Sequence, residues 1–148
     1  MSLRPGEWVK NELTHRISLC SRTCSEQSRG AVFLATINGS TVGCLGIRRL
    51  VAHRCAHNAR FALDVAADHQ GMGVGFRLLQ AGDTWAQQRK IGRFEMTFVE
   101  YNAAASKLYQ RYGYTLEGRR RVIFTLAGQP CDQLYTEKSF VRQLGFKV

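Results

Sequence analysis

Residues 61–82, FALDVAADHQGMGVGFRLLQAG, decide the fold of this chain. A strand-like run breaks into Gly71, Gly73 and Gly75 and then continues with helical periodicity. Glycines at alternate positions let a backbone turn without Cβ clashes and approach a ligand closely. A helix behind such a loop directs unpaired N–H groups and its positive dipole end toward that ligand. The stretch therefore predicts a backbone cradle for phosphate, into which an anionic cofactor fits.

The glycine spacing separates this loop from two better-known phosphate motifs. A dinucleotide-binding loop needs G-x-G-x-x-G, and a Walker loop needs Lys and then Ser or Thr after its last glycine. Here Phe76 and Arg77 follow Gly75. The loop instead resembles the Q/R-x-x-G-x-G/A pyrophosphate loop of the GNAT acetyltransferase superfamily, with Gln70, Gly73 and Gly75 in the defining places.

A second motif lies further along the chain. Residues 102–114, NAAASKLYQRYGY, resemble the family's N-x-x-A-x-x-L-Y-x-x-x-G-F/Y helix. Glu117, the basic run after it and Asp132 also resemble the bacterial branch that acetylates small amines and amino acids. The glycine loop alone could be a tight turn between a strand and a helix. Two motifs in the right order favour the resemblance, which covers roughly residues 58–140.

Length and composition bound the architecture. The 148 residues, 45% of them hydrophobic, suffice for one domain with a real core. The resemblance implies an α/β GNAT fold, in which a mixed, mostly antiparallel central sheet of about six strands is flanked by helices. We expect residues 1–148 to form a single domain, with a shortened N-terminal helical region (1–30) and a motif-bearing core (58–140). Because family members place a strand and two helices before the first hairpin, we expect the N-terminal strand to be missing.

Periodicity and turn residues locate the individual elements. Apolar residues at helical spacing predict an amphipathic helix within residues 6–28. A hairpin turn is predicted at Asn38-Gly39, between strands over 31–37 and 41–50. The later predicted elements are a strand (58–66), a helix (74–90), a strand (94–99), a helix (102–112) and two strands (119–127 and 132–140) joined by a turn over 128–130.

The resemblance also implies a cofactor and the residues that hold it. Acetyl-CoA is the expected co-substrate, with its pyrophosphate on the backbone N–H groups of residues 71–76. The main chain of Leu63 and Val65 is expected to pair with the pantetheine. Asn102 either contacts the cofactor or caps its own helix, and both are compatible. The expected cofactor-binding residues are Leu63, Val65, Gln70, Gly71, Met72, Gly73, Val74, Gly75, Phe76 and Asn102.

Tyr109 occupies the family's general-acid position. A phenol with an ordinary pKa of about 10 keeps its proton at neutral pH and can donate it to a departing thiolate. Tyr109 could also be only part of the inner stripe of an amphipathic helix. The general base is less defined, because Arg60 occupies the strand position that holds a catalytic Glu in many family members, and Thr97 occupies the position that a ribosomal-protein-acetylating branch uses. We take Glu100 as the catalytic carboxylate, with Asp64 or a water relay as alternatives.

Charge and cysteine content bear on partners and location. The formal net charge of +10 could attract acyl-CoA phosphates, bind nucleic acid or solvate the surface. Basic residues scatter along the chain rather than forming one tract, which disfavours nucleic acid as a partner. Five irregularly spaced cysteines, no signal peptide and no run of about 18 apolar residues predict a cytoplasmic protein without membrane contact. The H-x-C-x-H run at 53–57 does not complete a four-ligand site, so no metal is expected.

These features together predict an acetyl-CoA-dependent N-acetyltransferase. Its acceptor is expected to be the primary amine of a small molecule, an amino acid or a protein N-terminus. Arg60, in place of a carboxylate, suggests an acceptor that carries negative charge. A CoA-binding protein without turnover and a basic nucleic-acid-binding protein are the alternatives. The short N-terminal region also suggests a homodimer in which a second copy completes the acceptor pocket.

Overall fold

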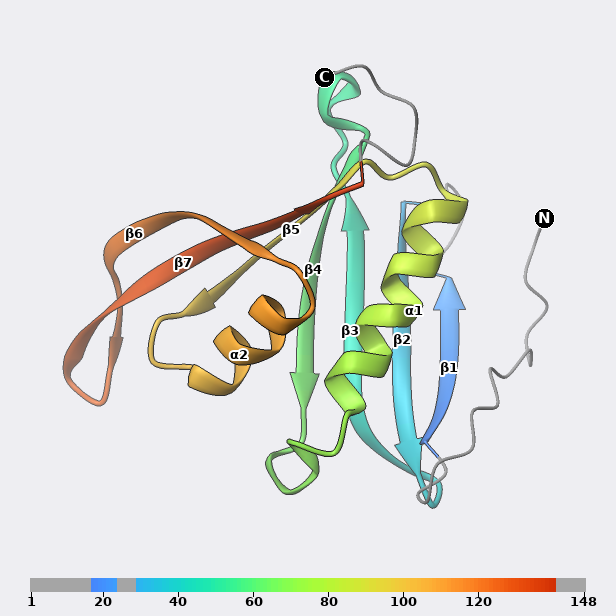
Figure 1. Ribbon diagram of the computed structural model, residues 1–148, viewed down its shortest axis with the longest axis horizontal. Coiled ribbons are helices and arrows are strands. Elements are labelled where there is room, and N and C mark those ends of the chain that lie inside the picture. Colours follow the sequence, from blue (N-terminus) through green and yellow to red (C-terminus); the bar gives the residue numbers. More distant parts are fainter. Residues whose placement is uncertain (1–16, 24–28, 141–148) are drawn as a thin grey trace.

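The computed structural model describes residues 17–23 and 29–140, which form a sheet of seven strands and two α-helices (Figure 1). The strands are β1 (Ile17–Thr23), β2 (Gly30–Ile37), β3 (Ser40–Arg49), β4 (Asn58–Val65), β5 (Arg93–Val99), β6 (Thr115–Leu126) and β7 (Gln129–Ser139), and the helices are α1 (Val74–Gln88) and α2 (Ala103–Arg111). The strand order is β1-β2-β3-β4-β5-β7-β6, and only β4 and β5 pair in parallel. The expected mixed, mostly antiparallel α/β sheet is confirmed.

Strand β1 corrects two predictions about the N-terminal region. A helix was expected within residues 6–28 and the first strand was expected to be missing, but Ile17–Thr23 pairs antiparallel with β2. The spacing of Leu13 and Ile17 suits a helix, whereas the alternation of Ile17 and Leu19 with polar or small residues suits a strand. The open edge of β2 supplies a ladder of backbone partners, which decides between the two. The remainder of the predicted helix lies outside the described residues.

Two tight turns join the hairpins of the sheet. Asn38 and Gly39 have φ of 50° and 82°, which confirms the predicted β2–β3 turn. The β6–β7 turn was expected over residues 128–130, but it is formed by Ala127 and Gly128, with φ of 47° and 77°. Two positive φ values in succession give a turn whose twist matches that of the flanking strands. Both hairpins therefore keep tight, two-residue connections.

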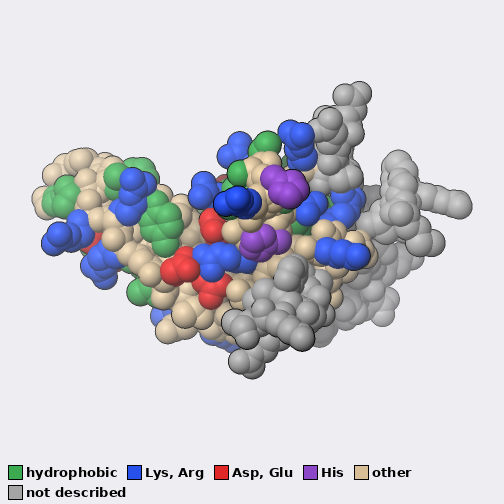
Figure 2. Space-filling view, turned by 90° about the horizontal axis from the view of Figure 1, so that it is seen from above, with side chains coloured by type: hydrophobic (Ala, Val, Ile, Leu, Met, Phe, Trp, Pro, Cys, Tyr) green, Lys and Arg blue, Asp and Glu red, His purple; other side chains and the backbone are tan. Residues whose placement is uncertain are grey.

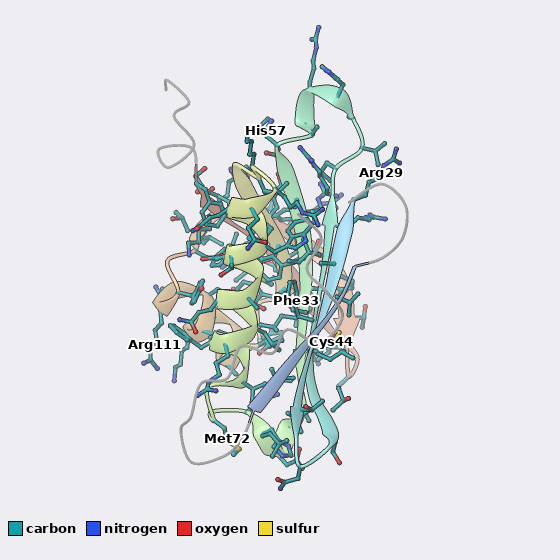
Figure 3. The ribbon with its side chains drawn as sticks, turned by 90° about the vertical axis from the view of Figure 1, so that its right-hand side faces the viewer. Arg29, Phe33, Cys44, His57, Met72 and Arg111 are labelled. Carbon is teal, nitrogen blue, oxygen red and sulfur yellow. The ribbon has the colours of Figure 1, made fainter. Side chains whose placement is uncertain are left out.

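The two helices pack against the same face of the sheet (Figures 1 and 3). The predicted inner stripe of α1 is buried, with Leu78, Trp85 and Ala86 at 0–5% exposure. Gly82 lets the helix approach closely, since a Cβ there would lie 2.9 Å from Cδ2 of Leu45 on β3. None of the described helices covers the opposite face, and none is long and apolar enough to cross a membrane.

Strands β4 and β5 separate soon after they begin to pair. Only three pairs of residues face each other, ending at Arg60 opposite Glu95. Strand β4 nevertheless continues to Val65, and β5 continues to Val99. Backbone groups on the β5-facing edge of β4 therefore have no strand partner beyond Arg60. The opening between the strands lies beside the N-termini of both helices and positions the site described next.

Candidate active site

The glycine loop before α1 presents a row of unpaired backbone N–H groups. Gly71 and Gly73 have φ of 76° and 80°, a left-handed conformation that glycine adopts without strain. Gly73 is the N-cap of α1, and its carbonyl accepts the first intrahelical bond from the Arg77 N–H at 3.1 Å. The N–H groups of residues 74–76 therefore have no intrahelical partner. This is the arrangement that binds an anion at a helix N-terminus.

Two contacts hold the loop in place. The side-chain amide of Gln70 donates to the Val65 carbonyl at 3.2 Å, which ties the loop back to the end of β4. Gly75 is the point of closest packing, because a Cβ there would lie 2.8 Å from Cδ2 of Leu108 on α2. Gln70 thus braces the loop, and the absence of a side chain at Gly75 lets α1 and α2 meet beside it.

A cavity of about 1070 Å³ lies over this loop, between the ends of β4, α1 and α2. Tyr109 and all the expected cofactor-binding residues line it. These are Leu63, Val65, Gln70, Gly71, Met72, Gly73, Val74, Gly75, Phe76 and Asn102. The fold thus gathers two sequence motifs, separated by a strand, around one space large enough for a cofactor.

The cavity also contains charged residues that sequence reasoning missed. Arg77, Lys107 and Arg111 line it together with His69, whereas Asp64 is its one carboxylate among the described residues. Lys107 and Arg111 are four residues apart on α2 and therefore share a face of that helix. This spacing, counted from the Asn102 motif, is the signal that could have found them. The excess of cations suits a ligand with several phosphates.

Asn102 fixes the start of α2 at the edge of the cavity. Its Oδ1 accepts a hydrogen bond from the Ala105 N–H at 3.0 Å, so the predicted N-cap is confirmed. Gly113, with φ of 92°, follows the C-terminal end of the helix as expected. The capping bond occupies Oδ1 and leaves the side-chain NH₂ for other partners.

Tyr109 lies at the inner side of the cavity, with only 3% of its surface exposed. Its ring packs against Phe61, Phe98 and Tyr114, at centroid distances of 6.1, 5.5 and 5.7 Å. Burial raises the pKa of the phenol above its usual value of about 10, and the negative charge of Asp64 raises it further. The hydroxyl therefore keeps its proton and acts as a donor.

Asp64 and Tyr109 reach the cavity from opposite faces of the sheet. On β4, Ala59 and Phe61 are buried on the helix side, so alternation places Asp64 on the other face. Both residues nevertheless line the same cavity. The charge of Asp64 also raises the pKa of the Tyr109 phenol, so the two groups lie near each other at the opening between β4 and β5.

Glu100, the predicted catalytic carboxylate, is not among the residues that line the cavity. Its Oε1 lies 2.7 Å from Nη2 of Arg119 on β6. Its backbone N–H donates to the Asp132 carbonyl on β7 at 3.0 Å. These contacts hold Glu100 at the β6–β7 hairpin, and Asp64 is the carboxylate that the structure places at the site.

Arg60 and Glu95 form an ion pair at the point where β4 and β5 separate. Nε of Arg60 lies 3.1 Å from Oε2 of Glu95, and Nε of Arg93 lies 3.2 Å from Oε1. Partial burial acts to raise the pKa of Glu95, but hydrogen bonds and charges from both arginines outweigh it and lower that pKa. Glu95 therefore stays ionised, and its ion pair holds the Arg60 side chain beside the opening.

Sequence comparison identifies a family and a curated relative that resemble this chain. A family model described as an acetyltransferase (GNAT) domain matches residues 28–116. The L-amino acid N-acetyltransferase AaaT of Escherichia coli (strain K12) is 30% identical over 106 residues, which are 69% of this chain and 64% of that protein. The chain therefore spans less than two thirds of the length of this curated relative.

Solved structures share the fold. A GNAT-family acetyltransferase from Streptococcus pneumoniae is 26% identical and superposes with a TM-score of 0.71, over 76% of this chain and 68% of that one. A putative acetyltransferase from Salmonella typhimurium, yncA, solved with its cofactor acetyl-CoA, is 19% identical with a TM-score of 0.69, over 74% of this chain and 64% of that one. The second likeness concerns the fold alone.

Proposed function

Because the chain belongs to the GNAT acetyltransferase family, we propose that it transfers the acetyl group of acetyl-CoA to the primary amine of a small molecule or an amino acid. One observation carries this proposal: the phosphate cradle, Tyr109 and Asp64 line one cavity. The name of the Escherichia coli relative supports an amino acid as the acceptor. The acetyl-CoA in the Salmonella structure supports the choice of co-substrate.

The residues of the cavity fit a coenzyme A molecule, which carries a pyrophosphate and a further phosphate on its ribose. We assign the pyrophosphate to the backbone N–H groups of residues 71–76. Arg77, Lys107 and Arg111 also line the cavity, and we assign the remaining negative charge to these cations. The free edge of β4 at Leu63 and Val65 offers main-chain groups to the pantetheine. When bound, acetyl-CoA supplies an acetyl group activated as a thioester.

Two side chains are positioned to handle protons, one from each side of the sheet. We propose that Asp64, rather than Glu100, accepts the proton of the attacking amine, either directly or through a water molecule. Unpaired N–H groups on the free edge of β4 are placed to stabilise the oxyanion of the tetrahedral intermediate. The hydroxyl of Tyr109 donates a hydrogen bond to the departing sulfur.

The raised pKa of Tyr109 defines what its hydroxyl does. A thiol has a pKa of about 8.5, whereas burial holds the phenol above 10. Complete proton transfer from Tyr109 to the thiolate is therefore uphill. The phenol stabilises the developing thiolate by a hydrogen bond. The amine loses one proton and CoA gains one when it leaves as a thiol, so the reaction balances.

We also propose that two copies of the chain associate through β6. This strand is an edge of the sheet, and Figure 1 shows the β6–β7 hairpin extending away from the body of the molecule. Its exposed apolar side chains are Leu116, Val122, Ile123, Phe124 and Leu126. Long apolar edge strands are templates for pairing, and the same strand on two copies gives a symmetric contact. A monomeric mass by light scattering at micromolar concentration would contradict the dimer.

The state of the cysteines supports a cytoplasmic location, which we propose for the protein. Cys44, Cys55 and Cys131 are free thiols in the part of the chain that the structure describes. Unpaired cysteines persist in compartments where glutathione and thioredoxin keep thiols reduced. Fractionation of cells that express a tagged full chain would test the assignment, and recovery with membranes or outside the cell would reject it.

Calorimetric titration with acetyl-CoA is the decisive test of the proposed activity. We expect binding that free CoA reproduces and ATP does not, followed by CoA release when amino acids are supplied. A set of acceptors with and without a carboxylate, including polyamines, would identify the amine. A folded protein that does not bind acetyl-CoA would refute the proposal. Binding without turnover on any amine would leave a CoA-binding protein.

A further inference from the structure

A positive surface lies at the end of the molecule opposite the glycine loop. It is built from the start of β2, the β3–β4 connection and the α1–β5 connection. We call it the basic end surface, and its exposed residues are Arg29, Arg48, His53, Arg54, His57 and Lys90. We propose that this surface binds the phosphate backbone of a nucleic acid, a function separate from acetyl transfer.

Backbone hydrogen bonds bring these segments together. The Arg49 N–H donates to the Arg29 carbonyl at 2.6 Å, and the Gly92 N–H donates to the His57 carbonyl at 2.7 Å. Figure 2, which views the molecule from above, shows Lys, Arg and His side chains gathered over this end. Figure 3 places Arg29 and His57 at one end and Met72 of the glycine loop at the other. The surface is therefore distinct from the cavity.

Within the described residues, the arginines and the lysine of this surface have no carboxylate in ion-pair distance. Residues 27–63 contain five arginines and neither Asp nor Glu. None of the ion pairs within the described ranges involves Arg29, Arg48, Arg54 or Lys90. The Nε of Arg49 donates to the Ala56 carbonyl and holds the β3–β4 connection in place. The remaining guanidinium groups are exposed and available to a ligand.

One of these charges, Arg48, faces a further arginine across neighbouring strands. Arg48 on β3 pairs in register with Arg60 on β4, and both are exposed on the face without helices. Residues directly opposite have Cβ atoms about 5 Å apart, and like charges there destabilise the sheet. Only Arg60 has a carboxylate partner, Glu95, within the described part of the chain. A phosphate between the two arginines would offset the repulsion.

The chemistry of this surface favours contacts that do not depend on base sequence. Arginine binds phosphate through two parallel N–H donors, which suits a nucleic-acid backbone. The exposed aromatic side chains that the structure describes, Phe76, Tyr101 and Phe124, belong to other parts of the fold, so none offers this surface a stacking platform. We therefore expect affinity that depends strongly on salt and little on sequence.

The separation of the two sites allows both to be filled together. Each strand residue advances about 3.3 Å, so the seven steps between the eight residues of β4 place roughly 23 Å between its ends. The glycine loop follows one end of β4, and the basic end surface lies at the other. Acetyl-CoA in the cavity should therefore not displace a nucleic acid from the proposed surface.

Fluorescence anisotropy with a labelled single-stranded RNA of about 20 nucleotides tests the proposal on the full chain. We expect a Kd of about 10⁻⁶ to 10⁻⁴ M near physiological salt, and a linear fall of log K with log salt concentration. The triple variant R29Q/R48Q/R54Q should weaken binding at least tenfold. It should also reduce the salt slope by about 2, because single-stranded binding loses about 0.7 per phosphate contact.

The matched control removes the same charge from the cavity. R77Q/K107Q/R111Q should weaken the acetyl-CoA titration and leave RNA affinity unchanged, whereas the first triple should do the reverse. If the first triple fails to fold, R48Q alone should reduce the slope by about 0.7. R48Q should also unfold no more easily than the wild type, because it removes a repulsive pair.

Three results would overturn the proposal. Equal weakening of RNA binding by both triples would show a general effect of net charge. Competition between acetyl-CoA and RNA would place the RNA in the cavity. Binding to polyglutamate or to vesicles with phosphatidylserine, without binding to RNA, would assign the surface to another partner. Each result is independent of whether amines are acetylated, so the two proposals fail separately.

Discussion

Replacing Tyr109 with Phe isolates the role of one hydroxyl group in catalysis. The ring packs among Phe61, Phe98 and Tyr114, and Phe preserves those contacts. The hydroxyl makes no hydrogen bond within the described residues, so the free energy of unfolding should change by less than about 1 kcal/mol. General-acid groups contribute about 10²- to 10⁴-fold to rate. Because this phenol donates a hydrogen bond rather than a full proton, we expect the lower limit, about 10²-fold or 2.7 kcal/mol.

Release of CoA, followed with a thiol reagent, measures kcat and KM for this variant, and calorimetry measures acetyl-CoA affinity. Affinity should stay unchanged, so that the loss lies in kcat. The wild-type kcat should also show no decrease from Tyr109 up to about pH 10, since burial raises the pKa of the phenol beyond that value. A kcat within twofold of the wild type would show that Tyr109 is only a packing residue of α2.

Three further substitutions test other parts of the site. Gly73→Val forces a branched residue to φ of 80°, at about 1–2 kcal/mol of strain, and calorimetry should show that acetyl-CoA binding is lost. Asn102→Ala removes the N-cap of α2 and should lower stability to urea by about 1 kcal/mol. Glu95→Gln removes a carboxylate whose pKa is lowered by folding, so its contribution is complete above about pH 4.3 and disappears as pH falls through the folded value. The difference in Tm between wild type and Glu95→Gln should therefore be largest near neutral pH and shrink in acid, and a difference that persists at pH 2 would contradict this account.

The sequence predicted those elements whose signal is local. The glycine loop, the Asn102 cap and the Asn38-Gly39 turn depend on residues adjacent in the chain, and each lies where expected. The first strand was missed because Ile17 fits both the helical spacing that begins before it and the alternation that follows it, and only pairing with β2 selects the strand. The predicted base Glu100 does not line the cavity, and the reason is similar. Glu100 forms an ion pair with Arg119 on β6. The position of Glu100 near Asn102 in the sequence therefore did not determine where its side chain lies.

The distribution of charge in space could be predicted only in small part from the order of residues. Arginines that are dispersed along the sequence come together because the ends of β3, β4 and α1 meet at one end of the fold. Likewise, Lys107 and Arg111 join Arg77 only where two helices converge on one cavity. The electrostatic field at the surface depends on how the fold brings distant residues together, whereas the phosphate cradle depends on a single short segment.

The short parallel pairing between β4 and β5 has a consequence for the lifetime of the protein. Three residue pairs and the packed core join a half-sheet of β1–β4 to one of β5–β7. A ligand bound in the opening would hold the two half-sheets together and add RT ln(1 + [L]/Kd) to the free energy of unfolding. Amides along that seam should exchange hydrogen faster without ligand. The cellular concentration of acetyl-CoA would then determine how often the two half-sheets separate and how quickly proteases degrade the chain.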